Sequence, residues 1–170
     1  RLRDLQIESR RANTVVVTKC PPKMPPIARR IVSNQLLLAS YQNLCYSSIQ
    51  YDELAIDSTP LLVAGIANPT PLYDYLKSLY PDTRMLAFAD HHVFTKRDVQ
   101  RILKMAEGYD WVVTTEKDYM RMLQTPLVEQ LGDKLKLISI KTDFGGDKET
   151  FERGIMLYVA ENNRKTTKMK

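Results

Sequence analysis

The chain has 170 residues, of which 44% are hydrophobic and 26% charged, and its formal net charge is +5. This composition is typical of a folded globular protein and excludes an intrinsically disordered chain, and no apolar run reaches the roughly 20 residues of a membrane-spanning helix. The length predicts one domain, which we place at residues 1–161, followed by a basic flexible tail at residues 162–170. The positive charge suits a phosphate-bearing ligand or an anionic membrane surface, and equally an ordinary basic protein.

Strands and helices alternate along the chain. The β-branched run at residues 14–19 predicts a buried strand, and the prolines within residues 21–26 end it before a helix begins. Such alternation is typical of right-handed crossovers in a parallel sheet, so we predict an α/β fold with a mostly parallel sheet and flanking helices. Strands are expected at residues 14–19, 43–51, 60–65, 84–89, 110–114 and 135–140. Helices are expected after Pro26 and at residues 72–79, 95–107, 116–123 and 148–161.

Polar segments come directly after four of the predicted strands. Because the carboxyl ends of parallel strands meet at one edge of a sheet, we expect these segments to lie together and to form a ligand site. The segments are Thr18-Lys19, Gly65-Ile66-Ala67-Asn68-Pro69, Asp90-His91-His92 and Thr115-Glu116-Lys117-Asp118.

The only two histidines are adjacent and follow an aspartate, in the segment Asp90-His91-His92. A carboxylate beside an imidazole can orient the ring for proton transfer or help it to face a phosphate group. Asp and His are also good ligands of divalent metals, and an Asp-His-His string after a strand resembles one family of metal-dependent phosphoesterases. Those enzymes need several further aspartates after the strands, whereas Asp57 stands just before its predicted strand and Asp110 at the beginning of its own, and not after them. We therefore assign no metal ligands.

Helix capping is the structural alternative for several of these residues. Thr95 with Asp98 fits a capping box at the start of one helix, and Thr115 with Asp118 fits the same box at the next. Gly65 and Asn68 could likewise supply a tight turn. Capping accounts for neither Lys117 nor two consecutive histidines.

Two kinds of binding motif are absent from the sequence. No segment matches G-x-x-x-x-G-K-[ST] or G-x-G-x-x-G, so the chain carries no phosphate-cradling loop of its own. The nine tyrosines are scattered among apolar positions, which disfavours a base-stacking platform and a nucleic-acid partner.

Four spaced motifs, in this order, resemble the C-terminal half of the tetraacyldisaccharide 4'-kinases, the lipid A kinases. The resemblance extends from Leu2 to about Ala160, and Leu2-Arg3-Asp4 is similar to a Leu-Arg-Glu that precedes the first motif in that family. The motifs are Val17-Thr18-Lys19-Cys20-Pro21, Gly65-Ile66-Ala67-Asn68-Pro69, Phe88-Ala89-Asp90-His91-His92-Val93-Phe94-Thr95 and Val113-Thr114-Thr115-Glu116-Lys117-Asp118.

The resemblance implies that the chain is the C-terminal lobe of a P-loop kinase-type fold. It implies phosphoryl transfer from ATP, with Mg²⁺, to the 4'-hydroxyl of the lipid A disaccharide 1-phosphate precursor. This reaction takes place at the cytoplasmic face of the inner membrane of Gram-negative bacteria, with peripheral contact to anionic lipid. In this family the P-loop belongs to the N-terminal half, so we expect the chain by itself to be soluble and inactive.

The resemblance also implies roles for individual residues. His91 matches a histidine that acts at the phosphoryl-transfer site, and Asp90 would support it. The other matched residues are expected to line the substrate or nucleotide cleft: Thr18, Lys19, Gly65, Asn68, His92, Thr115, Glu116, Lys117 and Asp118. A metal-dependent phosphoesterase and a non-catalytic anion-binding module are the alternatives.

Overall fold

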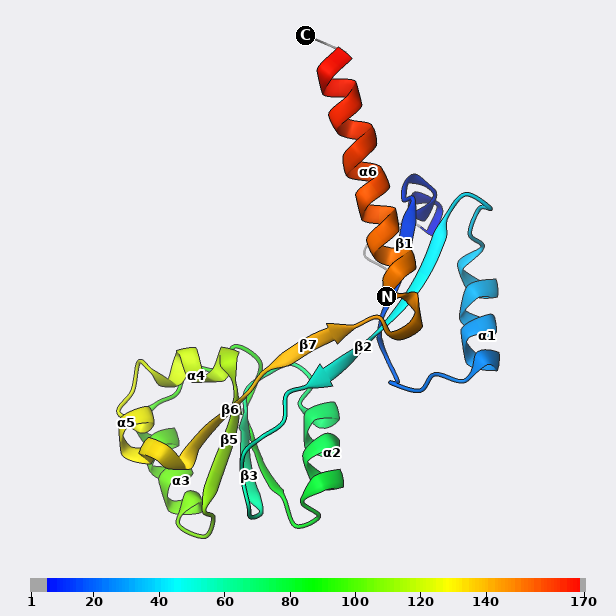
Figure 1. Cartoon of the computed structure of the whole chain (residues 1–170). Coiled ribbons are helices and arrows are strands. Elements are labelled where there is room, and N and C mark those ends of the chain that lie inside the picture. Colours follow the sequence, from blue (N-terminus) through cyan, green and yellow to red (C-terminus); the bar gives the residue numbers. More distant parts are fainter. Residues whose placement is uncertain (1–5, 169–170) are drawn as a thin grey trace. The chain divides into compact units, whose positions relative to one another are not determined.

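The computed structural model describes the backbone of residues 6–168 and the side chains of residues 8–160 (Figure 1). The chain forms two compact units, which differs from the one domain expected at residues 1–161. The central unit is Tyr51–Ser139, and the terminal unit is Arg1–Gln50 together with Ile140–Lys170. The strands fall into two separate sheets, which an alternating pattern along the sequence does not reveal.

The sheet of the central unit is entirely parallel. Its strand order is β4-β3-β5-β6, and each neighbouring pair is parallel. Helix α2 lies on one side of this sheet, whereas α3, α4 and α5 lie on the other (Figure 1). The strands are β3 (Pro60–Ala64), β4 (Arg84–Ala87), β5 (Trp111–Thr115) and β6 (Leu135–Ile138). The helices are α2 (Thr70–Leu79), α3 (Lys96–Ala106), α4 (Glu116–Met122), α5 (Leu127–Leu131) and the short 3-10 helix η2 (Gly132–Lys134).

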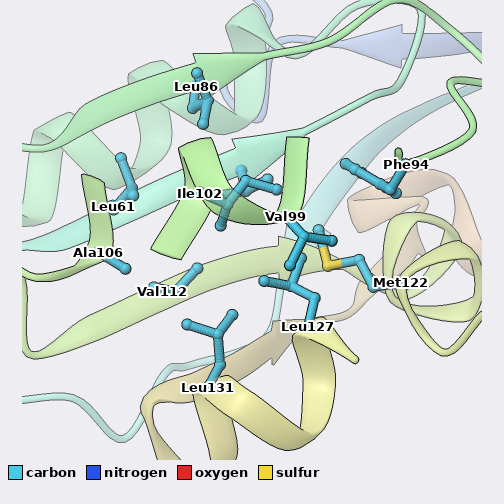
Figure 2. Packing of buried hydrophobic residues seen from close by; sticks show 11 residues of the cluster. Leu61, Leu86, Phe94, Val99, Ile102, Ala106, Val112, Met122, Leu127 and Leu131 are labelled. Carbon is cyan, nitrogen blue, oxygen red and sulfur yellow. The ribbon is translucent and has the colours of Figure 1, made fainter. Parts of the chain in front are cut away.

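Both faces of the central sheet are covered by hydrophobic clusters. Every residue of β3 is buried, as expected for a parallel strand with helices on both sides. Leu61 and Val63 belong to the cluster beneath α3, α4 and α5, which Figure 2 shows, whereas Leu62 and Ala64 belong to the cluster beneath α2. This packing holds the carboxyl ends of the strands in fixed positions.

The terminal unit has a three-stranded sheet of order β1-β2-β7. Strand β1 (Thr14–Cys20) pairs in parallel with β2 (Asn43–Tyr51), with a register shift between Val17 and Cys20. Strand β7 (Ile140–Asp143) runs opposite to β2 (Figure 1). The other elements are α1 (Pro26–Leu36), α6 (Lys148–Lys168) and the 3-10 helices η1 (Gln6–Arg11) and η3 (Gly145–Asp147).

The α/β class and most of the expected elements are confirmed, with three corrections. The expected strand at residues 135–140 is two strands, because the chain leaves the central sheet at Ser139 and continues as β7 in the other sheet. The last helix does not end at residue 161 but continues to Lys168, so residues 162–168 are helical and not a flexible tail. Residues 169–170 lie outside the described residues. Helix α5 and the 3-10 helices were not expected.

Within residues 6–168, no helix combines the length and the apolar character that crossing a bilayer requires.

Candidate functional site

Three of the four predicted segments meet at the carboxyl-end edge of the central sheet. Gly65 follows β3, Asp90-His91-His92 follows β4, and Thr115-Glu116-Lys117-Asp118 joins β5 to α4. A Cβ atom built on Gly65 would lie 3.0 Å from Asp118 Oδ1 and 3.4 Å from the carbonyl oxygen of Ala89. Glycine is therefore needed here because the three segments approach one another closely.

Asp118 is the buried centre of this edge, with no solvent exposure. Its Oδ2 atom accepts hydrogen bonds from the Gly65 N–H, at 3.0 Å, and from the Thr115 hydroxyl, at 2.8 Å. Its Oδ1 atom accepts a hydrogen bond from Arg121 Nη1 at 2.9 Å. A buried carboxylate is stable only when it is paired and hydrogen-bonded, and both oxygens are satisfied here. Thr115 also caps α4 by accepting a hydrogen bond from the Asp118 N–H at 3.2 Å.

Arg121 joins this network to His91, and we did not predict it from the sequence. Its Nη1 group donates to the Gly65 carbonyl oxygen at 3.0 Å as well as to Asp118, and its Nη2 lies 3.5 Å from His91 Nδ1. The only signal for it in the sequence is the i, i+3 spacing from Asp118, which places both residues on one face of α4.

His91 stands at the exposed end of the network. Its side chain is 83% exposed, and its Nε2 lies 3.7 Å from Asp90 Oδ2. Its backbone has a φ of 58°, in the left-handed region, and its N–H donates to Asp90 Oδ1 at 3.1 Å. Non-glycine residues in this region are uncommon and cluster at functional sites. The imidazole thus lies between a carboxylate and a guanidinium while remaining accessible to a ligand.

His92 differs from its neighbour, because it is packed into the unit. Its ring stacks on Phe88 at a centroid distance of 4.8 Å and meets the Phe94 ring edge-on at 5.3 Å. Its Nε2 lies 3.0 Å from Asp98 Oδ2. These contacts indicate a structural part for His92 and leave His91 as the histidine that faces solvent.

Asp98 also completes the expected capping box at the start of α3. Its carboxylate accepts hydrogen bonds from the Thr95 hydroxyl at 2.6 Å and the Thr95 N–H at 2.8 Å. The pKa of Asp98 is lowered from 3.8 to about 2. The hydrogen bond from the Thr95 hydroxyl is the main cause, followed by that from the Thr95 N–H and by a smaller contribution from His92.

The remaining predicted residues of this edge are exposed. Glu116 accepts a hydrogen bond from the Ser139 hydroxyl at 2.6 Å. Asn68 and Lys117 are exposed, and neither side chain forms a hydrogen bond or ion pair with another residue of the described chain. Their positions beside the network leave them free to contact a ligand.

Thr18 and Lys19 do not belong to this edge. They lie on β1 of the terminal unit, in the other sheet, so the four segments do not share one sheet edge as expected. Both are exposed, and Lys19 has a left-handed φ of 60°. The expectation depended on a single sheet, and the division of the strands between two sheets removes its basis.

The described residues offer no obvious metal centre. Between residues 6 and 168, no group of three or more His, Cys, Asp or Glu side chains is arranged to hold a metal ion. Within this part of the chain, the metal-dependent phosphoesterase interpretation lacks the ligand cluster that it needs.

Comparison with known proteins agrees with the motifs. The sequence model of the Tetraacyldisaccharide-1-P 4'-kinase family matches residues 1–159. A tetraacyldisaccharide 4'-kinase of Phocaeicola vulgatus is 35% identical over an alignment of 185 positions, which covers 96% of this chain and 50% of that protein. The corresponding proteins of Bacteroides thetaiotaomicron and Flavobacterium johnsoniae are each 34% identical, with 98% and 95% of this chain covered and 51% and 49% of theirs.

The chain spans about half the length of the curated relatives that it matches. No solved structure matches it. Because the family model covers nearly the whole sequence, the chain belongs to the Tetraacyldisaccharide-1-P 4'-kinase family.

Proposed function

We propose that the chain is the C-terminal part of a kinase that phosphorylates the 4'-hydroxyl of tetraacyldisaccharide 1-phosphate, a precursor of lipid A. The observation that carries this proposal is the family match over residues 1–159. The edge around His91 supports it, because this edge offers an accessible imidazole beside a fixed guanidinium. Both groups suit a reaction that is promoted mainly by positioning and by stabilisation of charge.

In the proposed reaction the 4'-oxygen forms a bond to the γ-phosphorus of ATP while the bond from that phosphorus to the β–γ bridging oxygen breaks. ADP leaves, and the proton of the 4'-hydroxyl is removed with the help of His91. Asp90 supports His91 on one side, with its Oδ2 atom 3.7 Å from Nε2. Asp90 also accepts the His91 N–H and so holds the unusual backbone conformation of that residue.

The sites of ATP and Mg²⁺ are proposed to lie mainly in the part of the relatives that this chain does not cover. The sequence has no phosphate-cradling motif, and the described residues have no cluster that fits a divalent cation. We therefore assign no residue of this chain to Mg²⁺. The net charge of +5 is compatible with peripheral contact to anionic lipid at the cytoplasmic face of the inner membrane, where the disaccharide substrate would be reached.

The proposal is tested by replacing His91 in the full-length kinase and measuring phosphoryl transfer to the disaccharide 1-phosphate. We expect His91→Ala to lower kcat by about 10- to 100-fold, because general acid–base assistance is worth roughly 100-fold or more at full efficiency. His92→Ala serves as the matched neighbour, since its ring is held by Phe88, Phe94 and Asp98.

We expect His92→Ala to lower the melting temperature more than His91→Ala does. We expect His92→Ala to lower kcat less, when both variants are assayed well below their melting temperatures. An unchanged kcat in His91→Ala would reject the assignment of His91 to the transfer step.

A further inference from the structure

Arg121 is a fixed cation at the exposed edge of the central sheet. A guanidinium has five N–H donors. Two hydrogen bonds come from Nη1 of Arg121, one to Asp118 Oδ1 at 2.9 Å and one to the Gly65 carbonyl oxygen at 3.0 Å. Asp118 is fully buried, whereas the Arg121 side chain is 22% exposed. The Asp118 carboxylate therefore anchors the guanidinium from the buried side and does not itself reach solvent.

The other arm of this guanidinium is available to a ligand. Among the residues that the structure describes, no oxygen acceptor is bound by Nε or Nη2 of Arg121. The contact of Nη2 is with His91 Nδ1, at 3.5 Å, which is a long and weak hydrogen bond. An arginine whose first arm is anchored loses little further conformational freedom when the second arm binds an anion.

The groups around Arg121 limit what kind of anion fits. His91 lies on one side, and Asp90 faces the far side of that imidazole, with its Oδ2 3.7 Å from His91 Nε2. The Asp118 carboxylate accepts hydrogen bonds from three donors, which belong to Gly65, Thr115 and Arg121, and its negative charge is therefore compensated inside the unit. At this point a planar donor group and an imidazole face solvent, with the Asp90 carboxylate, 45% exposed, on the far side of the imidazole. The donor group and the imidazole together match the oxygens of a phosphate group.

We propose that Arg121 and His91 together bind a phosphate group. The inference deepens the proposed function and rests on it, because a nucleotide and a sugar 1-phosphate are the phosphate-bearing molecules of that reaction. It gives Arg121 a binding role, and it gives the network of Gly65, Thr115 and Asp118 the role of holding Arg121 in place.

The first test uses sodium pyrophosphate and NMR spectroscopy of the chain itself, without any turnover. The chain has only two histidines, so the imidazole signals of His91 report on the site while those of His92 serve as an internal reference. We expect saturable shifts at His91 and at the Nε–H of Arg121, with little change at His92. Shifts of equal size at both histidines, or none at His91, would overturn the proposal.

The decisive variant is Arg121→Lys, which keeps the positive charge near Asp118 but removes the second donor arm. We expect pyrophosphate to bind about tenfold more weakly, as for the loss of one charge-assisted hydrogen bond. Arg101→Lys, an exposed position on α3 with the same change of side chain, is the matched control and should leave the affinity unchanged. Equal affinity in wild type and Arg121→Lys would contradict a site at Arg121.

A second variant covers the case in which Arg121→Lys does not fold. His91→Gln leaves the anchored network intact, and the Nε–H signal of Arg121 then reports on binding. We expect this signal to shift in His91→Gln with weaker affinity than in the wild type. An affinity equal to that of the wild type would remove His91 from the site.

Two further titrations identify the source of the phosphate. Stronger binding of ATP than of glucosamine 1-phosphate assigns the site to the nucleotide, and the reverse assigns it to the sugar lipid. Because these measurements need no catalysis, they remain informative if His91→Ala leaves kcat unchanged and the proposed function fails.

Discussion

The two units of this chain contain similar strands in different surroundings. Strand β3 (Pro60–Ala64) is buried at every residue, because α2 covers one face of its sheet and α3, α4 and α5 cover the other. Strand β1 (Thr14–Cys20) is richer in β-branched residues than β3, yet none of its residues is buried. Helix α1, the next element along the chain, also has no buried residue. A valine-rich run thus predicts a strand, but only the surrounding elements decide whether that strand is buried.

Helix α6 of the terminal unit also leaves apolar residues exposed. Five consecutive apolar side chains, which span more than one helical turn and so point in all directions, are 47–69% exposed: Ile155, Met156, Leu157, Tyr158 and Val159. A helix that is apolar on all sides is typical of a protein interior. The central unit closes its own core, whereas the terminal unit does not within the described residues. This incompleteness agrees with a chain that spans about half the length of its curated relatives.

The largest expected effect is a difference in the cost of truncating one leucine in each unit. Leu62 on β3 has no solvent exposure, whereas Leu44 on β2 is only partly buried. We expect Leu62→Ala to lower the free energy of unfolding by about 2–5 kcal/mol, because it leaves a cavity in a closed core, and Leu44→Ala to lower it by about 1 kcal/mol.

Urea unfolding measures this difference. The only tryptophan, Trp111, lies on β5, so its fluorescence reports on the central unit, while circular dichroism reports on the helices of both units. Equal losses of stability in the two variants would show that the terminal unit has a closed core. That result would contradict the proposed difference between the two units.

Much of the fold could be predicted from the sequence because it depends on local patterns. The strand that begins at Thr14 and the capping box of Thr95 and Asp98 are local features, and both are confirmed. The break at Ser139 could not be predicted, since an apolar run has the same pattern whether or not the chain changes sheets. For the same reason the sequence did not reveal that Thr18 belongs to a different sheet from the central segments.

In the candidate site, too, local patterns could be predicted from the sequence and contacts between distant residues could not. The segments at Gly65, His91 and Asp118 were found because each follows a predicted strand, and parallel strands bring such segments together. Arg121 was missed because its partners are distant in sequence: the Gly65 carbonyl oxygen is 56 residues away and His91 is 30 residues away. No local pattern can specify contacts of that kind. The different surroundings of the two adjacent histidines also follow from packing alone.

A smaller effect is expected from adding one methyl group at a glycine in each unit. In the central unit, a Cβ on Gly65 would lie 3.0 Å from Asp118 Oδ1 and 3.4 Å from the Ala89 carbonyl oxygen. In the terminal unit, a Cβ on Gly146 would have nothing within 4 Å. We expect Gly65→Ala to lower the free energy of unfolding by about 1–3 kcal/mol, whereas Gly146→Ala should change it by less than about 0.5 kcal/mol.

Urea titrations of both glycine variants test this expectation. A Gly65→Ala protein as stable as the wild type would mean that the three segments at the edge of the central sheet are not as closely packed as the structure shows.

The smallest expected effect is a dependence of stability on pH through Asp98, which caps α3 in the central unit. Its pKa falls from 3.8 to about 2 in the folded state, mainly through the Thr95 hydroxyl. A carboxyl group with a lowered pKa stabilises the folded state fully above its unfolded pKa, and this contribution is lost as the pH falls through the folded value. The contribution is at most about 2.5 kcal/mol, because one pKa unit corresponds to roughly 1.4 kcal/mol.

We therefore expect the wild type to lose more stability than Asp98→Asn between pH 5 and pH 2, with Trp111 fluorescence as the readout for the central unit. The variant should be less stable at pH 6 and should approach the wild type as the pH falls through about 2, where the Asp98 carboxyl group of the folded wild type becomes protonated. Parallel pH profiles for the two proteins would mean that the capping box contributes through its geometry and not through the charge of Asp98.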